Sequence, residues 1–132
     1  MRGNWRQTKY GNHKVTVDGI EFDSKKEYHR WCELRLLERA GEIRDLRRQV
    51  EYELIPNQYE TVERFGKKGQ RLKDGQRCIE KKVSYVADFV YEQDGKTIVE
   101  DTKGYRKGTA YSVFVIKRKL MLKEHGLLVK EV

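Results

Sequence analysis

The chain has 132 residues, enough for one domain with a modest hydrophobic core. Charged residues make up 38% of it and hydrophobic residues 37%, with a single proline, which is typical of a soluble globular protein. No apolar stretch approaches the length of a membrane span or of a signal-peptide core, so both classes are excluded. Cys32 and Cys78 have no CxxC spacing, and we expect reduced thiols and a cytoplasmic location.

The formal net charge is +8, and it is unevenly distributed along the chain. Residues 1–14 carry four basic residues and no acid, and residues 102–123 carry seven and no acid. Residues 64–77 carry six basic residues against one acid. Most acids lie instead between residues 21 and 63. Such segregation indicates a nucleic-acid-binding face, because neutralising phosphates releases counterions, although a solvated charged surface is the simpler interpretation.

The first predicted element is a small hairpin over residues 14–22, around an Asp18-Gly19 turn, preceded by a basic arm over residues 1–13. A helix is expected over residues 24–40, because Ser24 and Glu27 have the spacing of a capping box. Alternating apolar residues then predict a strand at 50–55, which Pro56 should end.

Residues 57–76 are glycine-rich and basic, and we expect a long loop or a loose hairpin inserted into the single domain. A central hairpin should follow, with strands near 78–91 and 96–103. After a basic linker at 104–108, the remaining pattern predicts a helix at 112–124 and a last strand at 127–129.

The central hairpin contains the most informative residues of the chain. A two-residue turn at Asp94-Gly95 would pair Tyr91 with Ile98 and Asp88 with Asp101. Because side chains alternate along a strand, Lys103 should share the face of Asp101. Facing carboxylates repel one another, so a fold retains them where a cation lies between them.

This pattern favours a divalent-metal phosphodiesterase site. Mg²⁺ prefers oxygen ligands, commonly one or two carboxylates with waters and phosphate oxygens, and the carbonyl of Thr102 is a further candidate ligand. A bound cation would lower the pKa of water and stabilise charge that develops on phosphate. Lys103 would either orient the attacking water or stabilise the transition state. An ordinary surface ion pair between Asp101 and Lys103 is the alternative.

Two glutamates flank this predicted site. Glu27 is explained equally well as a helix cap or as a carboxylate that reaches the metal from the first helix. Glu100 should alternate to the opposite face, against Phe89, and would become a ligand only after a register slip or a bulge.

The order helix, strand, strand, strand, helix, strand, with Asp88 followed by Asp101-Thr102-Lys103, resembles the PD-(D/E)XK nuclease superfamily. Ala87 stands where the superfamily has its proline. The phrases Tyr85-Val86-Ala87-Asp88-Phe89 and Val99-Glu100-Asp101-Thr102-Lys103-Gly104 are similar to a family of small phage-encoded proteins, including Holliday junction resolvase-like nucleases. The resemblance implies a restriction-endonuclease-like αβββαβ core, with a central mixed sheet flanked by helices. It also implies that Glu27 acts with Asp88, Asp101 and Lys103.

We therefore expect a Mg²⁺- or Mn²⁺-dependent DNA endonuclease that acts on branched or distorted DNA in phage replication, recombination or packaging, with homodimerisation expected by analogy alone. The residues expected to grip DNA are basic ones in and around the predicted loops: Arg64, Lys67, Lys68, Arg71, Lys73, Arg106, Lys107 and Lys117. Two rivals remain, a non-catalytic DNA- or RNA-binding module on the same scaffold and a structural phage protein with no nucleic-acid affinity.

Overall fold

The computed structural model describes residues 4–7 and 13–132, with the side chains from residue 14 onward. The described chain begins with a small antiparallel sheet of three strands, β1 (Asn4–Gln7), β2 (His13–Val17) and β3 (Ile20–Phe22). The hairpin predicted around Asp18-Gly19 is confirmed, and β1 adds a strand that was not expected. Most of the predicted basic arm lies outside the described residues.

Helix α1 (Lys25–Arg39) follows directly, and its start agrees with the predicted cap. The Ser24 Oγ accepts a hydrogen bond from the Glu27 backbone N–H at 3.1 Å. Gly41, at φ +77°, adopts the left-handed conformation just beyond the last turn, which glycine tolerates without a Cβ clash.

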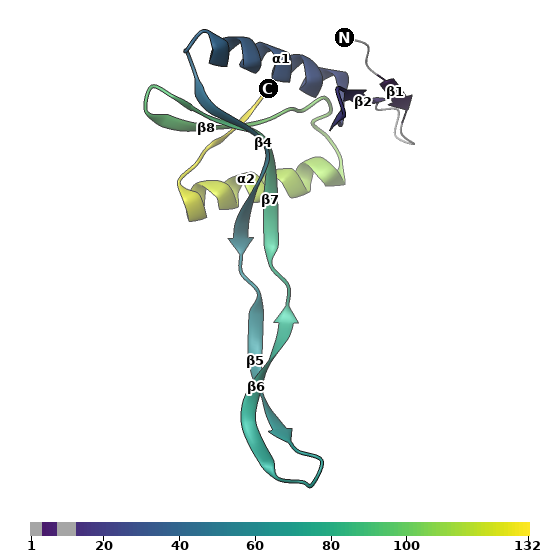
Figure 1. The fold of residues 1–132 in the computed structure, drawn as a ribbon, viewed down its shortest axis with the longest axis vertical. Helices are drawn as coiled ribbons and strands as arrows, with labels where there is room; N and C mark the ends of the chain where they lie inside the picture. Colours follow the sequence, from purple (N-terminus) through teal and green to yellow (C-terminus); the bar gives the residue numbers. More distant parts are fainter. Residues whose placement is uncertain (1–3, 8–12) are drawn as a thin grey trace.

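The central sheet is mixed and has four strands in the order β4-β7-β8-β9. Its strands are β4 (Arg44–Ile55), β7 (Val83–Gln93), β8 (Lys96–Asp101) and β9 (Val129–Glu131), and helix α2 (Thr109–His125) connects the last two. The β8–β9 pairing is parallel and the other two are antiparallel. Because α1 lies on one side of this sheet and α2 on the other, the fold is a mixed α/β arrangement with the predicted element order (Figure 1).

Several predicted boundaries were wrong. Strand β4 begins at Arg44, six residues before the expected start, because its polar first half pairs with the end of β7 at Arg47↔Val90 and Arg48↔Phe89. Pairing of this kind overrides a weak local strand signal. Helix α2 begins at Thr109 rather than 112, and the last strand lies two residues later than expected.

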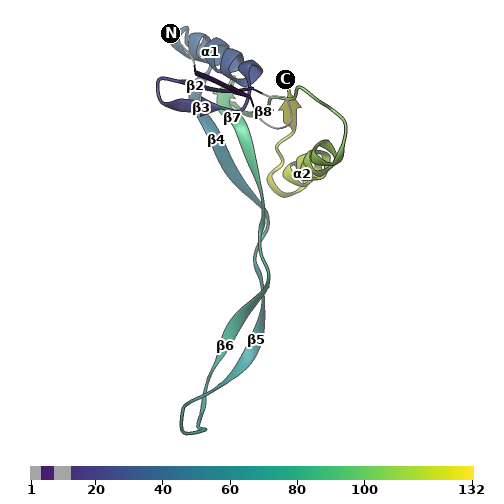
Figure 2. The same cartoon turned by 90° about the vertical axis from the view of Figure 1, so that its right-hand side faces the viewer.

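The basic segment 57–76, expected to be a long loop or a loose hairpin, is a hairpin formed by β5 (Gln58–Phe65) and β6 (Arg71–Glu80). It continues the line of β4 and β7 and projects from the body as a two-stranded ribbon, which we call the arm (Figure 2). Cross-strand pairs hold it, including a Gln76–Thr61 side-chain hydrogen bond and a Glu60–Arg77 ion pair. The glycines and charged residues of this segment weaken the alternation of apolar and polar residues by which a strand is predicted from the sequence.

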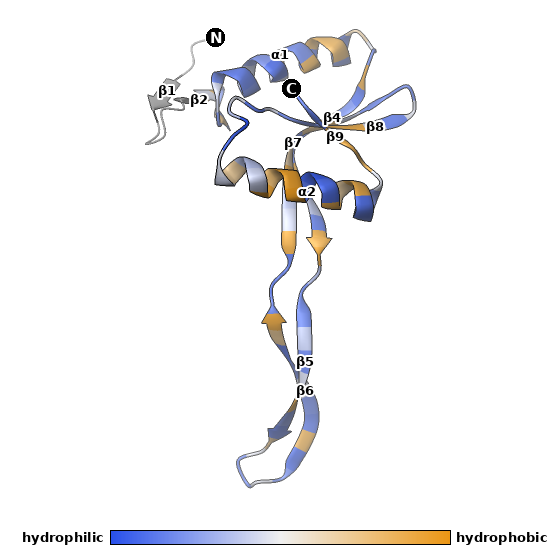
Figure 3. Ribbon diagram, turned by 180° about the vertical axis from the view of Figure 1, so that it is seen from behind, coloured by the Kyte–Doolittle hydropathy of each residue, from blue (hydrophilic) through white to orange (hydrophobic). Residues whose placement is uncertain are grey.

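The sheet separates two main apolar clusters. On the α1 side, Leu34 and Ile43 pack with Phe89 and Tyr91. The α2 side contains a larger cluster of strand and helix residues: Leu54, Tyr85, Ala87, Val90, Val99, Phe114, Met121 and Val129. Figure 3 shows apolar residues along the middle of α2 and mostly hydrophilic ones along the arm. No helix in the described part of the chain is long and apolar enough to cross a bilayer.

A buried ion pair attaches α1 to the sheet. The Arg30 guanidinium donates to both carboxylate oxygens of Glu100, at 2.8 and 2.7 Å, and the Tyr91 hydroxyl also donates to Glu100. The Glu100 side chain is fully buried, whereas that of Arg30 is 23% exposed. These contacts lower the pKa of Glu100 against the opposing effect of burial.

Replacing Arg30 with Met should lower the free energy of unfolding by about 3 kcal/mol, because it leaves a buried carboxylate without its cation. The double variant Arg30→Met/Glu100→Gln should regain a large part of that loss, since Gln has no charge and Tyr91 can still donate to it. Urea unfolding of both variants at pH 7 measures the difference. Equal stability of the two variants would contradict a dominant role for the uncompensated charge.

Candidate active site

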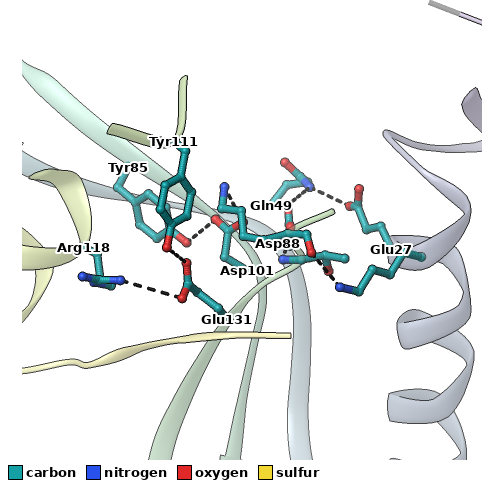
Figure 4. Close-up of polar contacts among 11 residues, drawn as sticks. Glu27, Gln49, Tyr85, Asp88, Asp101, Tyr111, Arg118 and Glu131 are labelled. Carbon is teal, nitrogen blue, oxygen red and sulfur yellow. Dashed lines mark hydrogen bonds and ion pairs between the residues drawn. The ribbon is translucent and has the colours of Figure 1, made fainter. Parts of the chain in front are cut away.

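The β7–β8 hairpin brings Asp88 and Asp101 together. Its turn is Asp94-Gly95, with φ values of +53° and +75°, and the register runs from Gln93↔Lys96 to Phe89↔Glu100 as predicted. Beyond that pair the ladder opens, and the Asp88 Oδ2 accepts a hydrogen bond from the Thr102 backbone N–H at 2.8 Å. Figure 4 shows the two aspartates beside one another.

Asp101 is buried and held by two donors. Its Oδ2 accepts from the Tyr85 hydroxyl at 2.6 Å, and its Oδ1 lies 2.9 Å from the Lys103 Nζ. The Lys103 ammonium also lies 3.9 Å from the centroid of the Phe114 ring. Lys103 thus shares the face of Asp101, as the alternation predicted, and an aromatic ring limits its freedom to move.

Glu27 reaches the same region from α1. Its carboxylate accepts from the Asp23 backbone N–H at 3.0 Å and from the Gln49 Nε2 at 3.1 Å, and it lies 3.6 Å from Arg48. Burial, the largest effect, raises its pKa. The sequence left capping and site roles open. In the structure the Glu27 carboxylate accepts from Asp23, the residue before the N-cap, and it also points toward Asp88 (Figure 4).

Gln49 joins these carboxylates, and sequence reasoning missed it. Its Nε2 donates to Glu27 and lies 3.4 Å from the Asp88 Oδ1. Its φ of +52° is in the left-handed region, which costs a non-glycine residue about 1 kcal/mol or more. No local signal in the sequence marks a glutamine within a polar stretch for this conformation.

The side chains of strands β4 and β7 change sides of the sheet at this position. On β7, Tyr85 and Ala87 pack in the α2 cluster, yet Phe89, of the same parity, packs in the α1 cluster. On β4, Leu46 packs toward α1 and Val50 toward α2. Regular alternation would keep these residues on one face, so the strands switch sides between 87 and 89 and between 46 and 50. Asp88 and Gln49 lie within the switch.

Burial and the neighbouring carboxylates together raise the pKa of Asp88 to about 7. Burial is the largest cause, followed by the negative charges of Asp101 and Glu27, whereas the Thr102 N–H and Lys103 act in the opposite direction. A cation between these crowded carboxylates would reduce their electrostatic repulsion.

The donor set fits a divalent metal that prefers oxygen ligands. Mg²⁺ is commonly held by one or two carboxylates plus water and substrate oxygens, and Asp88 with Asp101 supplies that number. Within the described residues, no group of three or more His, Cys, Asp or Glu side chains is arranged to hold a metal. Two carboxylates would leave the remaining positions around such a cation to water or phosphate oxygens.

Two further acids lie close by but are already neutralised. Glu100 points to the opposite face, as predicted, and is bonded to Arg30 and Tyr91. Glu131, the neighbour of Asp101 on β9, accepts from the Tyr111 hydroxyl at 2.8 Å and lies 3.8 Å from Arg118. Neither carboxylate is free for a metal in this arrangement.

The structure does not bring the predicted DNA-contacting residues together at the carboxylates. Arg106 and Lys107 lie in the exposed segment that follows β8, whereas Lys117 lies half-buried on α2. The others lie on the arm: Arg64, Lys67, Lys68, Arg71 and Lys73. The arm tip lies about 50 Å from Gln49 at about 3.3 Å per strand residue. Arg71 is partly neutralised by Asp74 at 2.9 Å and Glu63 at 3.7 Å.

We expect Asp88→Asn to stabilise the metal-free protein at pH 8 by about 1 to 2 kcal/mol. Asp88 has a pKa near 7 in the folded protein and near 3.9 in an unfolded chain. Between these values the folded state binds the extra proton, so the contribution of Asp88 to stability falls as pH rises through 7. Asn does not titrate, and its oxygen can still accept from the Thr102 N–H.

Urea unfolding in EDTA at pH 5 and pH 8 measures this effect. The stability gained by Asp88→Asn should be larger at pH 8. The same gain at both values would contradict the raised pKa.

Residues 7–129 match a protein-family model described as "Protein of unknown function (DUF1064)". No curated protein and no solved structure matches the chain. The matched region contains α1, the whole central hairpin, the arm and α2, and therefore every residue of the carboxylate cluster. The chain belongs to the DUF1064 family.

Proposed function

We propose that this protein is a divalent-metal-dependent DNA endonuclease. The observation that carries the proposal is the burial of Asp88 beside the carboxylates of Asp101 and Glu27 and a fixed Lys103, an environment that raises the Asp88 pKa to about 7, through burial first and the two negative charges second. Perturbed carboxylates next to a positioned cation are more common at catalytic sites than on ordinary surfaces. The order of helices and strands is also that of the restriction-endonuclease-like core, with Asp88 and Asp101 at the positions that the resemblance implies.

Asp88 and Asp101 would hold Mg²⁺ or Mn²⁺, together with the main chain at Thr102, and Glu27 would contribute through Gln49. A bound cation supplies a water of lowered pKa and neutralises charge that develops on the phosphate. Gln49 holds the Glu27 and Asp88 side chains in fixed positions, and Tyr85 does the same for Asp101. These contacts would set the geometry of the carboxylates before substrate binds.

Lys103 supplies the positive charge of the protein itself. Its ammonium is held by Asp101 and the Phe114 ring, so it lies beside the carboxylates without needing to reorganise. In hydrolysis a water oxygen bonds to phosphorus, the P–O bond to one sugar breaks, and that sugar oxygen gains a proton. Lys103 would orient the water or stabilise the extra negative charge on the phosphate.

The arm would bind the DNA backbone at a distance from the cut. In its tip, residues 64–73 carry five basic residues and no acid. Within the described residues, no ion pair engages Lys67 or Lys68. A two-stranded ribbon also fits the major groove of a duplex. About 50 Å of reach corresponds to about 15 base pairs, so the substrate would need a duplex segment beside the cleaved bond.

Branched or distorted DNA processed in a phage-infected cytoplasm remains the substrate and setting we favour, because the basic residues expected to bind DNA are suited to phosphates, which carry no sequence information directly. A homodimer would provide two sites for two strands of a junction.

Asp101→Asn should lower cleavage of supercoiled plasmid by at least about 100-fold, because the site loses a carboxylate that would hold the cation. Affinity for DNA should be unchanged or higher, since a negative charge near phosphate has been removed. Plasmid nicking with Mg²⁺, Mn²⁺ or EDTA, together with a gel-shift assay, measures both. Asp94→Asn, in the turn of the same hairpin, is the matched control and should cleave normally.

Undiminished nicking by purified Asp101→Asn would refute the assignment of the site. If the unmodified protein binds DNA in a salt-sensitive manner but cleaves with no divalent ion, the non-catalytic binding module is the correct function. If it neither cleaves nor binds, the structural-protein alternative is favoured.

The variant Lys67→Gln/Lys68→Gln should reduce the slope of log affinity against log salt by about 2, since each phosphate contact contributes about 0.9. The control Arg39→Gln/Lys96→Gln removes the same charge from exposed positions outside the arm and should leave the slope nearly unchanged. Fluorescence anisotropy with a 30-base-pair duplex over a range of salt concentrations measures the slopes. Equal slopes for the two variants would rule out arm binding.

A further inference from the structure

A basic cavity of about 340 Å³ lies next to the carboxylate cluster. It is formed by one face of α1 and the ends of β8 and β9, and its main lining residues are Lys26, His29, Arg30, Glu33, Thr102 and Lys130. The four helix residues are spaced i, i+3, i+4 and i+7, so they occupy a single face. Thr102 belongs both to this lining and, through its backbone N–H, to the hydrogen bonding of Asp88.

The charges of the cavity are not balanced internally. Arg30 is already engaged by Glu100 and by Glu33, the latter at 2.9 Å. Glu33 is thereby neutralised, and it is the single acid among the six lining residues named. The ammonium groups of Lys26 and Lys130 have no carboxylate partner among the described residues. Lys26 and Lys130 are therefore the two cations of the cavity without an ion pair in the described part of the chain, although Lys130 lies within the electrostatic reach of Glu100, and His29 shares the helix face of Lys26.

Two hydrogen-bonding features connect the cavity to the site. The Lys26 Nζ donates to the Lys103 backbone carbonyl at 2.6 Å, which leaves further N–H donors on the ammonium. The Thr102 Oγ1 is buried and has no hydrogen-bond partner. A buried hydroxyl without a partner is uncommon and costs free energy, which a ligand oxygen would recover.

From these observations we infer that the cavity is a phosphate-binding subsite for the DNA strand that is cut. The inference rests on the proposed function and specifies where a phosphate next to the cleaved bond would lie. Two ammonium groups, an imidazole and a hydroxyl are donors suited to phosphate oxygens, and the first turns of a helix favour an anion. The volume accommodates a phosphate with part of its sugar.

The same chemistry would bind an internal phosphodiester or a terminal phosphate monoester. An internal phosphate would suit cutting within a strand, and a terminal phosphate would direct the protein to DNA ends. The experiment below separates these two sources.

Binding should be measured in the Asp101→Asn background, where the DNA remains intact, by fluorescence anisotropy in EDTA. A set of duplexes, each carrying one neutral methylphosphonate, removes the charge of one phosphate at a time. At one position the affinity should fall about 5- to 10-fold. Adding Lys130→Gln or His29→Gln should make that same substitution cost less than twofold, because the side chain that binds this phosphate has already gone.

The control is Lys96→Gln, an exposed lysine in the β7–β8 turn, whose effect should be additive with every methylphosphonate. Circular dichroism confirms folding of each variant, and both Lys130 and His29 are exposed. For the terminal source, duplexes with a 5′- or 3′-phosphate are compared with the corresponding hydroxyl ends. If an end phosphate raises the affinity and Lys130→Gln abolishes that increase, the cavity is assigned to DNA ends.

Additive losses at every internal position, together with no effect of end phosphates, would overturn the subsite. Because no measurement depends on cleavage, a coupled phosphate in a protein that never cuts DNA would leave the subsite standing while the nuclease proposal fails. Conversely, if the unmodified protein cuts DNA normally but all the losses in binding are additive, the nuclease proposal stands and the subsite proposal fails.

Discussion

Between residues 87 and 89 the side chains of β7 change sides, because Ala87 packs in the α2 cluster whereas Phe89 packs in the α1 cluster and Val90 takes the α2 side, and β4 makes the same change between Leu46 and Val50. This switch is where Gln49 adopts its left-handed backbone and where the β7–β8 ladder opens at Asp88. Acids from both layers can approach one another there, Glu27 from the α1 side and Asp101 from the α2 side. In a regular sheet the same residues would be kept apart by the sheet itself.

The acids around this switch differ in how their charge is compensated. Glu100 has Arg30 and Tyr91, Glu131 has Tyr111 and Arg118, and Asp101 has Lys103. Asp88 has a backbone N–H and a glutamine amide but no ion pair with a described residue, and burial together with the neighbouring carboxylates raises its pKa. The fold thus stabilises its structural acids and leaves one carboxylate under electrostatic stress. A carboxylate whose charge is poorly compensated, among neighbouring acids that have cationic or hydroxyl partners, is typical of a functional site.

The arm is stabilised in a different way from the carboxylate cluster. A two-stranded ribbon without a covering layer is marginal by itself, and here it is an extension of β4 and β7, which are held in the body. Ion pairs such as Glu60–Arg77 stabilise its shaft, whereas Lys67 and Lys68 at the tip form no ion pair with any residue that the structure describes. Mutual repulsion at the tip disfavours the free state and would be relieved by a polyanion. The cavity beside Thr102 likewise has more basic than acidic side chains in its lining, and it lies closer to the carboxylates.

Local chemistry in the sequence was sufficient to predict the Asp18-Gly19 and Asp94-Gly95 turns, the Ser24 cap and the β7–β8 register as far as Phe89↔Glu100, but not the opening of the ladder before Asp88 and Asp101. These features depend on residues close together in the chain, and turn type sets register directly. Side-chain alternation likewise placed Lys103 with Asp101 and Glu100 on the other face. The first half of β4, the paired strands of the arm and the role of Gln49 were decided by tertiary structure. Their residues carry weak or contrary local preferences, and contacts between segments distant in the sequence determine their conformations.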